Sequence, residues 1–297
     1  MMRASNNVLS GTASSRTATT RRTDPRGGVT HVVQNGRGAL VPPDGYWQEL
    51  RRICDTHGVL LVADEVITSF GRVGHWFASE RFGVVPDVIT FAKGVTSAYL
   101  PLGGMLVRTP HLESVWNSEV GAFLHGSTFG GHPASTAVAA ANIAALESER
   151  VLDNVDLQAR LLRNTLDRLL DAHDCVGEIR GTGFLHAIEL TASRERGRPL
   201  TDAQHSSLRS GLLGGWVRDA GVLVRPDDRG ATMLIIAPPL IATPEVIADL
   251  GARLDHVLAE TDAWLSIPHT PSESGSHCFI RPPSSARPPT IGGTEHS

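Results

Sequence analysis

The chain has 297 residues, of which 41% are hydrophobic and 20% are charged, and its formal net charge is −4. This composition is typical of a soluble globular protein with one large or two modest cores, and the charge gives no reason to expect a nucleic acid or a membrane as a partner. The three cysteines lack the short spacing of a disulfide framework or a zinc site, so we expect a cytoplasmic protein.

The first segment, residues 1–28, is rich in Ser, Thr, Arg and Gly and shows no apolar period. It cannot bury enough surface to offset chain entropy, so we expect disorder there. Val29–Gln34 can form the end of a strand. Tyr46–His57 predicts a helix that ends at Gly58, a typical C-terminal glycine. Its predicted apolar face comprises Tyr46, Leu50, Ile53 and Cys54.

Two short apolar runs follow, and each leads into residues that can do chemistry. Val59–Ala63 precedes Asp64 and Glu65, and Asp87–Ala92 precedes Lys93. Runs this short and this apolar indicate strands that are buried on both faces of a parallel sheet. The segment between them has room for a crossover helix, which we place around Trp76–Phe82.

The residues after Lys93 complete the first part of the chain. Leu102–Val107 predicts a third strand, and His125–His132 predicts a glycine-rich loop. Pro133–Glu147 predicts an alanine-rich helix, whose small side chains allow a neighbouring element to approach closely. Leu152–His173 predicts a longer helix, and we place the boundary between two domains between these two helices.

The second part has a mixed α and β pattern. Val176–Leu190 predicts one bent strand with Gly181 and Gly183 at its kink. Thr243 is a good N-cap and Pro244 a good first residue for the last helix. The tail after Pro268 shows no pattern, so we expect disorder. The other predicted elements are a helix over 202–220 and strands over 222–224 and 233–236.

Asp64 and Lys93 together suggest a reaction. They leave the carboxyl ends of two parallel strands, where open α/β sheets bind their ligands. An Asp can hold a ring nitrogen protonated and a Lys can form an imine with an aldehyde, as in pyridoxal phosphate (PLP) chemistry. The rival interpretation is a nucleotide hydrolase, but that needs a G-x-x-x-x-G-K-[ST] loop, which the chain lacks. Val66 either lies against the ring or packs in the core.

Two further residues have a functional and a structural interpretation. Thr128 precedes a helix N-terminus within a glycine-rich loop, a suitable place for a phosphate group, although such a loop also occurs without a ligand. Arg225 follows a short apolar run and either clamps a substrate carboxylate or is an exposed arginine at the end of a strand. The histidines show no spacing that indicates a metal site.

Several segments together carry a resemblance that spans residues 33–261. The segments are LLVADEVITSFGRVGHWF, PDVITFAKG, YLPLGG, HGSTFGGHP, EIRGTGF and APPLIATPEVI. In this order they resemble the class III (ω-type) aminotransferases, PLP enzymes of fold type I. Ile67 and the Gly-His-Trp-Phe segment are closer to the branch that uses pyruvate as the amino acceptor.

The resemblance implies a role for each candidate residue. Lys93 is then the catalytic Schiff-base lysine, Asp64 pairs with the pyridinium nitrogen and Val66 packs on the ring. Thr128 binds the phosphate of the neighbouring subunit's PLP, which implies a homodimer with shared sites. Arg225 receives the substrate carboxylate. The implied reaction moves an amino group between an amine or amino acid and a keto acid.

The same resemblance implies an incomplete fold. We expect a partial fold type I large domain with a truncated, mostly parallel α/β sheet over residues 29–147, and an α+β small domain over 148–265. Residues 1–28 and 266–297 are then disordered flanks. The family's long N-terminal portion has no counterpart in this sequence. His31 and Val32 replace a Glu-Pro pair, and Ala98 stands where a glycine is usual. The alternative function is therefore a truncated, inactive remnant that associates with a full-length relative.

Overall fold

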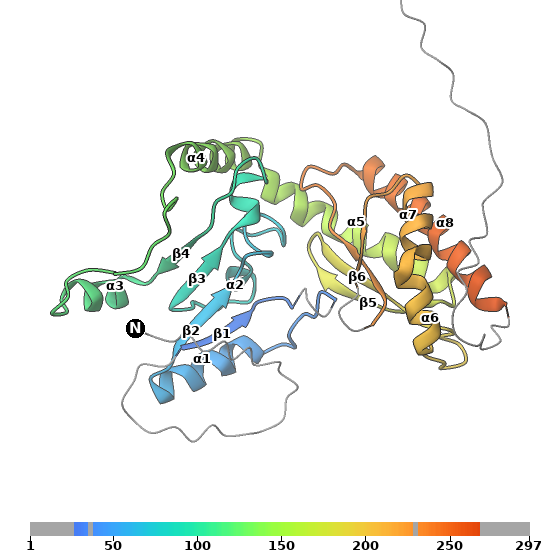
Figure 1. Ribbon diagram of the computed structural model, residues 1–297, viewed down its shortest axis with the longest axis horizontal. Coiled ribbons are helices and arrows are strands. Elements are labelled where there is room, and N and C mark those ends of the chain that lie inside the picture. The colour runs from blue at the N-terminus through green and yellow to red at the C-terminus, as the bar shows by residue number, and fades with distance from the viewer. Residues whose placement is uncertain (1–26, 35–37, 228–230, 268–297) are drawn as a thin grey trace, which may run out of the picture. The chain divides into compact units, whose positions relative to one another are not determined.

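The computed structural model describes residues 27–34, 38–227 and 231–267, and its first sheet is mostly parallel (Figure 1). The strand order is β1-β2-β3-β4. The first three strands run parallel, and β4 returns antiparallel to β3. The predicted parallel pair that carries Asp64 and Lys93 is thus confirmed. The bounds of the strands are Gly27–His31, Leu60–Asp64, Val88–Phe91 and Gly104–Val107.

Helix α1, Tyr46–His57, has the predicted bounds and ends at Gly58, which has a left-handed φ of 61°. Its buried face differs from the prediction, because Trp47 is 1% exposed while Tyr46 and Ile53 are more than 40% exposed. The large indole fills the space against β2, so the helix turns that side inward. The remaining helices of this part are α2 (Ala78–Arg81), η2 (Lys93–Thr96), α3 (Thr109–Trp116) and α4 (Pro133–Ser148).

The crossover helix α2 is only four residues long, shorter than predicted. The chain from Val66 to Phe77 is irregular instead, with positive φ at Phe70, Gly71 and Gly74. These backbone angles are incompatible with a continuous helix. The sequence pattern around Trp76 reflects burial and not helical periodicity.

Asp87 fastens the start of β3 to its surroundings. It is 4% exposed and accepts hydrogen bonds from the Leu61 amide and the Arg51 guanidinium, both at 2.8 Å. His111 and Arg108, from the segment around α3, lie 2.9 and 3.2 Å from the same carboxylate. Burial alone favours the neutral acid, but these donors outweigh it and hold the pKa of Asp87 at about 2.

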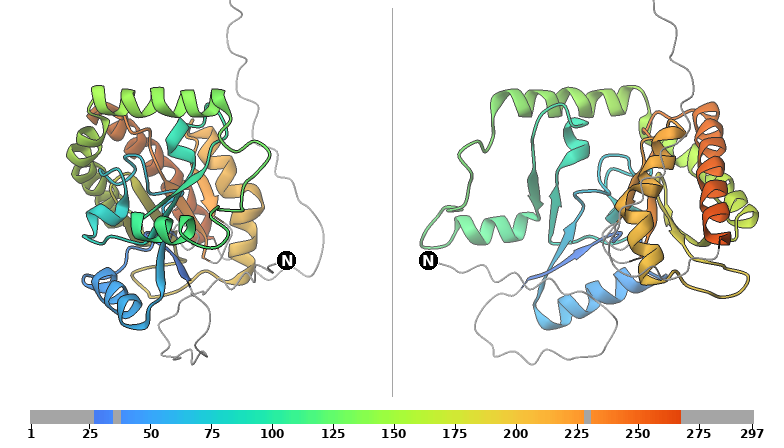
Figure 2. Two further views of the ribbon diagram at one scale, coloured as in Figure 1. Left: turned by 90° about the vertical axis from the view of Figure 1, so that its left-hand side faces the viewer. Right: turned by 45° about the vertical axis from the view of Figure 1, so that its right-hand side comes forward.

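The second sheet is entirely antiparallel, with the order β5-β6-β8-β7. One of its faces packs with α5, α7 and α8 around the largest hydrophobic core (Figure 2). The other face packs against Val33, Ala39 and Ile67 of the first part, which joins the two sheets. The elements are β5 (Val176–Thr182), β6 (Leu185–Leu190), β7 (Arg225–Asp227), β8 (Met233–Ile236), α5 (Val151–Ala172), α6 (Asp202–Ser207), η3 (Leu208–Leu212), α7 (Leu213–Asp219) and α8 (Pro244–Ser266).

Three predictions for this part are corrected by the structure. The expected bent strand is a hairpin of β5 and β6, because Gly183, at a φ of 59°, reverses the chain. The expected helix over 202–220 is interrupted at Gly211, whose φ is 140°. The expected strand over 222–224 is not a strand, and β7 begins at Arg225.

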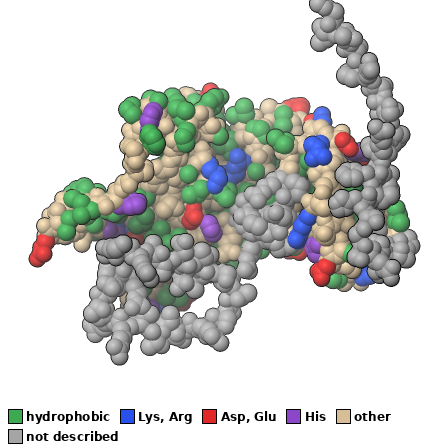
Figure 3. Space-filling model, viewed as in Figure 1, with side chains coloured by type: hydrophobic (Ala, Val, Ile, Leu, Met, Phe, Trp, Pro, Cys, Tyr) green, Lys and Arg blue, Asp and Glu red, His purple; other side chains and the backbone are tan. Residues whose placement is uncertain are grey.

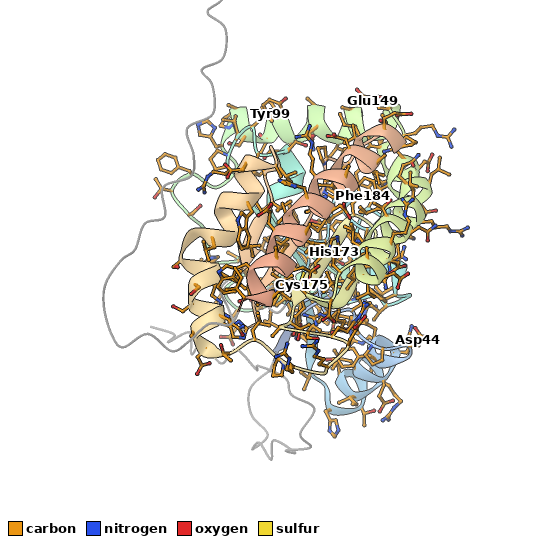
Figure 4. The ribbon with its side chains drawn as sticks, turned by 90° about the vertical axis from the view of Figure 1, so that its right-hand side faces the viewer. Asp44, Tyr99, Glu149, His173, Cys175 and Phe184 are labelled. Carbon is orange, nitrogen blue, oxygen red and sulfur yellow. The ribbon has the colours of Figure 1, made fainter. Side chains whose placement is uncertain are left out.

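The end of α5 is bound to α8 by a small polar cluster (Figure 4). The His173 ring lies between two carboxylates of α8, with Asp262 at 2.8 Å and Asp255 at 3.0 Å. The Cys175 amide donates to Asp262 at 2.8 Å, and burial raises the pKa of the Cys175 thiol well above its usual range. This cysteine is therefore an inert core residue.

Both sheets belong to one compact unit that ends at Ser266, so the predicted division into two domains at residue 148 remains a prediction. The predicted disordered flanks mostly lie outside the described residues, but Gly27 and Gly28 belong to β1 and Ser266 ends α8. Among the described helices, none has the length and apolar character that crossing a membrane requires.

Candidate functional site

Lys93 stands at the carboxyl end of β3, where the chain enters η2 in a strained conformation. Its φ is 47°, and Ser97 and Ala98 have φ values of 48° and 64°. A left-handed conformation costs a residue other than glycine about 1–2 kcal/mol. Three such residues in one short turn must therefore be held by their surroundings, and strain of this kind is typical of functional sites.

Asn142 of α4 supplies much of that support. Its side-chain amide donates to the carbonyl oxygens of Gly94 and Val95 at 3.0 and 3.1 Å, and its oxygen accepts from the Ser97 hydroxyl at 2.7 Å. A single side chain of α4 thus contacts three residues of the lysine turn. Pattern and spacing give no hint of this role.

The amine of Lys93 has no partner among the described residues, since it makes neither a hydrogen bond nor an ion pair there. Lys93 is also the only lysine in the sequence, where the other 26 basic residues of the 27 are arginines. The chain has thus placed its one side-chain amine, a potential nucleophile, at this edge of the sheet. The composition of the sequence carries this signal, which strand patterns and motif spacing do not reveal.

Asp64 ends β2 beside Thr90 of β3, so its carboxylate lies at the same edge as Lys93. Its Oδ1 accepts from the Val66 amide at 3.1 Å and from the Thr90 hydroxyl at 3.4 Å. The Nδ1 of His31 lies 3.2 Å from its Oδ2, and the side chain of Asp64 remains 23% exposed. Sequence reasoning identified Asp64 and missed the contact with His31, which arises because the two residues pair across β1 and β2.

Glu65, the next residue, has a purely structural environment. It is fully buried and accepts three hydrogen bonds of 2.7 Å, from the Thr68 hydroxyl and from the amides of Ala78 and Ser79. The two amides belong to the start of α2, so Glu65 closes the irregular loop onto that helix. A carboxylate so enclosed cannot polarise a water molecule, which disfavours the nucleotide-hydrolase interpretation.

A cavity of about 640 Å³ adjoins Lys93. The first part of the chain contributes Arg72, Tyr99, Asn142 and Glu149 to its wall, and the segment that follows β8 contributes Leu240. The Nη1 of Arg72 donates to the carbonyl oxygens of Pro238 and Phe184, at 2.7 and 3.2 Å. Burial lowers the pKa of Arg72 to about 10. Arg72 thus links the loop after Asp64 to the second sheet.

No side-chain contact in the described structure joins the other predicted residues to Lys93. Val66 is half-buried and joins Asp64 through its amide. Thr128 lies in an exposed loop between α3 and α4 and makes no hydrogen bond to another described residue. The backbone of Arg225 begins β7, and its side chain lies outside the described part. Within the described residues, no three His, Cys, Asp or Glu side chains gather as metal ligands.

The family model for class III aminotransferases matches residues 28–258. A probable aminotransferase of Mycobacterium tuberculosis is 42% identical over 77% of this chain and 48% of its own length. The putrescine–pyruvate aminotransferase of Pseudomonas aeruginosa is 36% identical over 79% of this chain and 50% of its length. The chain therefore spans about half the length of these relatives.

Solved transaminase structures also match this chain over about half of their own length. A transaminase from the marine bacterium Virgibacillus superposes with a TM-score of 0.75 at 35% identity, covering 80% of this chain and 53% of that one. An amine transaminase from an uncultivated Pseudomonas species, in its PLP-bound form, superposes with a TM-score of 0.72 at 35% identity, covering 78% and 51%. With its fold, its sheet-edge acid and lysine and its sequence all in agreement, the chain belongs to the class III aminotransferases.

Proposed function

We propose that this chain carries the lysine-bearing half of a PLP-dependent aminotransferase site. The observation that carries the proposal is the placement of Asp64 and of the chain's only lysine, strained and without a partner, at the carboxyl ends of adjacent parallel strands. An acid for the ring nitrogen and a free amine for the aldehyde are the two protein groups that pyridoxal chemistry requires.

PLP, when bound, supplies an aldehyde and a pyridinium ring that withdraws electrons from the reacting carbon. Asp64 would hold the proton on the ring nitrogen, and His31 would fix the orientation of its carboxylate through Oδ2. Lys93 would hold the aldehyde end of the group through Nζ, and its amine, when free, would carry a proton to and from the substrate carbon. Val66 follows Asp64 and would pack against the ring.

The phosphate and the substrate carboxylate require residues that the described site lacks. We assign the phosphate contact to Thr128 of a neighbouring subunit, because its loop is exposed and it precedes the N-terminus of α4. Family likeness supports Arg225 as the residue for the carboxylate. The Thr128 assignment implies a homodimer whose site is shared between subunits.

The names of the relatives support a substrate class. One relative is a putrescine–pyruvate aminotransferase, and another, from Bilophila wadsworthia, is a taurine–pyruvate aminotransferase that is 34% identical over 76% of this chain. We therefore propose a primary amine or amino acid as the donor and a keto acid such as pyruvate as the acceptor.

A second candidate is an inactive remnant that associates with a full-length relative. It is favoured by the coverage, because the chain matches only 48–50% of the curated relatives described above. Each lost hydrogen bond to the phosphate weakens PLP binding by about 1 kcal/mol, so half a site binds the cofactor poorly.

Borohydride fixation separates the two candidates. The purified chain is mixed with PLP, reduced, digested and analysed by mass spectrometry, and turnover of an amine with pyruvate is measured in parallel. The active-site proposal expects the cofactor mass on Lys93, a visible absorbance band and turnover, all of which Lys93→Ala abolishes. Asp64→Asn should keep the covalent label and lose the turnover.

If the folded chain shows neither the PLP label on Lys93 nor turnover, the second candidate, an inactive remnant, is supported. A PLP label on the N-terminal amine alone would also contradict the proposed role of Lys93. Because the sequence contains a single lysine, no other side-chain amine competes for the label.

A further inference from the structure

Helix α4 carries a single amide side chain on its packed face. Ala139 and Leu146 of this helix are buried and pack with Phe70 and Val95. Asn142 lies three residues after Ala139 and four before Leu146, so the helical period places it on the same face. It is the only Asn or Gln of α4, a helix over which hydrophobic side chains gather (Figure 3). Asparagine is a weaker helix former than alanine, so helix formation does not explain this residue.

The partners of Asn142 decide which way its amide points. The carbonyl oxygens of Gly94 and Val95 can only accept, so Nδ2 must face them, and Oδ1 is left to accept from the Ser97 hydroxyl. The amide therefore spends both its donors and its acceptor on the lysine turn. Aspartate has the same shape but offers no donor, and leucine offers neither a donor nor an acceptor. The contacts thus require an asparagine and not merely a side chain of this size.

The lysine turn is held from its opposite side as well. An added Cβ at Gly94 would lie 3.3 Å from the Ser69 carbonyl oxygen, and Val95 is only 3% exposed. The turn is therefore enclosed between the loop that follows β2 and the amide of Asn142. Lys93 begins the turn with a φ of 47°, and rotation of this angle to a relaxed negative value would redirect its side chain.

We propose that Asn142 is the positioning residue of the lysine. By holding the carbonyl groups of Gly94 and Val95, it keeps Lys93 in its left-handed conformation and the amine at the sheet edge that Asp64 shares. Without these bonds the turn relaxes and the amine loses its fixed position. The inference deepens the proposed function, on which it rests for the reaction of the amine, and it names a residue that acts through the backbone.

Matched variants test the proposal. Asn142→Asp keeps the shape, removes both donors and sets a carboxylate against two carbonyl oxygens. Asn154→Asp is the control, because Nδ2 of Asn154 in α5 likewise donates to two carbonyl oxygens, those of Leu240 and Ala242, at 2.8 and 3.2 Å. Both variants should lose comparable stability in urea. Ser97→Ala, at an exposed position, removes only the bond to Oδ1, so it should fold and show a smaller effect in the same direction.

The first readout needs no cofactor. Amide hydrogen exchange is followed by mass spectrometry in the full chain, for the peptide that covers residues 93–99. Loss of two hydrogen bonds in Asn142→Asp should accelerate exchange in this peptide by roughly tenfold or more. Asn154→Asp should leave the exchange of the same peptide as it is in the parent chain.

The second readout uses the N-terminal amine as an internal standard. Because the sequence has one lysine, PLP can react with only two amines, that of Lys93 and the N-terminal one. PLP is added, the adducts are reduced with borohydride, and the ratio of the two labels is read from the peptide masses. The parent chain should favour Lys93. Asn142→Asp should lower the ratio by roughly tenfold or more, toward that of the chain unfolded in urea, whereas Asn154→Asp should not.

Two results would overturn the proposal. One is that Asn142→Asp and Asn154→Asp lose stability equally while turn exchange and label ratio stay as in the parent chain, because Asn142 is then purely structural. The other is that both variants accelerate exchange of the turn to the same extent. If the parent chain itself does not favour Lys93, the proposed function fails. Exchange alone then decides for Asn142, since selective acceleration supports its role and an unchanged turn refutes it.

Discussion

The residues around Lys93 show how much local strain the fold sustains to present one amine. Lys93, Ser97 and Ala98 all adopt left-handed backbone angles, and Asn142 holds the turn from α4. The family resemblance implies a glycine at the position where this chain has Ala98. The φ of 64° at that position gives a physical reason for the glycine, since it adopts this conformation without steric conflict.

We therefore predict that Ala98→Gly stabilises the protein. Relief of the left-handed strain should raise the free energy of unfolding by about 1 kcal/mol. Ala259→Gly, at an exposed site inside α8, is the control and should lower it by about 1 kcal/mol. Urea denaturation of the two variants measures both changes in the free energy of unfolding. A loss of stability in Ala98→Gly would contradict backbone strain at this residue.

A second prediction concerns His186, which is 2% exposed and whose Nδ1 has no hydrogen-bond partner. Burial lowers its pKa from 6.5 to about 4, with a smaller contribution from the Arg163 charge. Above pH 6.5 the ring is neutral in both folded and unfolded chains. As the pH falls from 6.5 to 4 only the unfolded chain takes up this proton, so the free energy of unfolding should fall by about 3 kcal/mol.

Urea denaturation at several pH values between 7 and 4 measures this slope. His186→Phe keeps a ring of similar shape and removes the proton, so it should lose most of the slope. If the variant shows the same pH dependence as the parent chain, the acid sensitivity comes from other groups.

At the scale of elements, the second sheet is fastened to the first by close backbone contact. Gly183, in the turn between β5 and β6, lies so near the Arg72–Val73 segment that an added Cβ would be 2.5 Å from the Val73 Cα. The Phe184 amide also donates to the Arg72 carbonyl at 2.9 Å. The hairpin thus anchors the irregular loop that follows Asp64.

Gly183→Ala should accordingly be strongly destabilising. Gly197 supplies the matched control, because its φ of 60° equals that of Gly183 within a degree while nothing lies within 4 Å of its added Cβ. Gly197→Ala should lower the free energy of unfolding by about 1 kcal/mol from backbone strain alone. Gly183→Ala should lower it by about 3 kcal/mol or more, since backbone atoms must also move. Equal losses in thermal or urea denaturation would refute the contact.

The elements with strong local signals were predictable. Helices α1, α4 and α8 have their caps, prolines and glycines in place, and β8 is a short apolar run. The hairpin was missed because Gly181 and Gly183 were interpreted as a kink within one strand, whereas the turn at Gly183 reverses the chain completely. At the site, Asp64 and Lys93 follow from the strand pattern. His31 and Asn142 do not, because their contacts with Asp64 and Gly94 join residues 33 and 48 positions apart, which only the folded sheet brings together.

For the whole molecule, the distribution of buried side chains is uneven. The largest core lies between the second sheet and α5, α7 and α8, whereas β4 and α3 contribute no buried residue. Few buried contacts and many exposed backbone hydrogen bonds characterise regions that open at low free energy. The family and the parallel sheet could be predicted from the sequence, but this imbalance could not, because it depends on how the elements stack.

We predict a corresponding gradient in amide hydrogen exchange for the chain alone. Amides of β6, β8 and the buried side of α8 should exchange slowest, with protection that approaches the global free energy of unfolding. Those of β4 and α3 should exchange orders of magnitude faster. Exchange followed by mass spectrometry of peptides measures both, and uniform protection across the two sheets would show that β4 and α3 are not a weak region.

The contacts of Asn142 couple the surface of α4 to the turn that holds Lys93. Asn142 belongs to α4, much of whose surface is exposed, while its side chain holds Gly94, Val95 and Ser97 beside the amine. A contact that immobilises α4 would therefore also immobilise the lysine turn, so an event at the helix surface and an event at the amine would share one free energy of coupling. By reciprocity, if a contact on α4 tightens binding at the amine by some factor, binding at the amine must tighten that contact by the same factor. The two events would then form a single thermodynamic cycle, with Asn142 as the physical link between them.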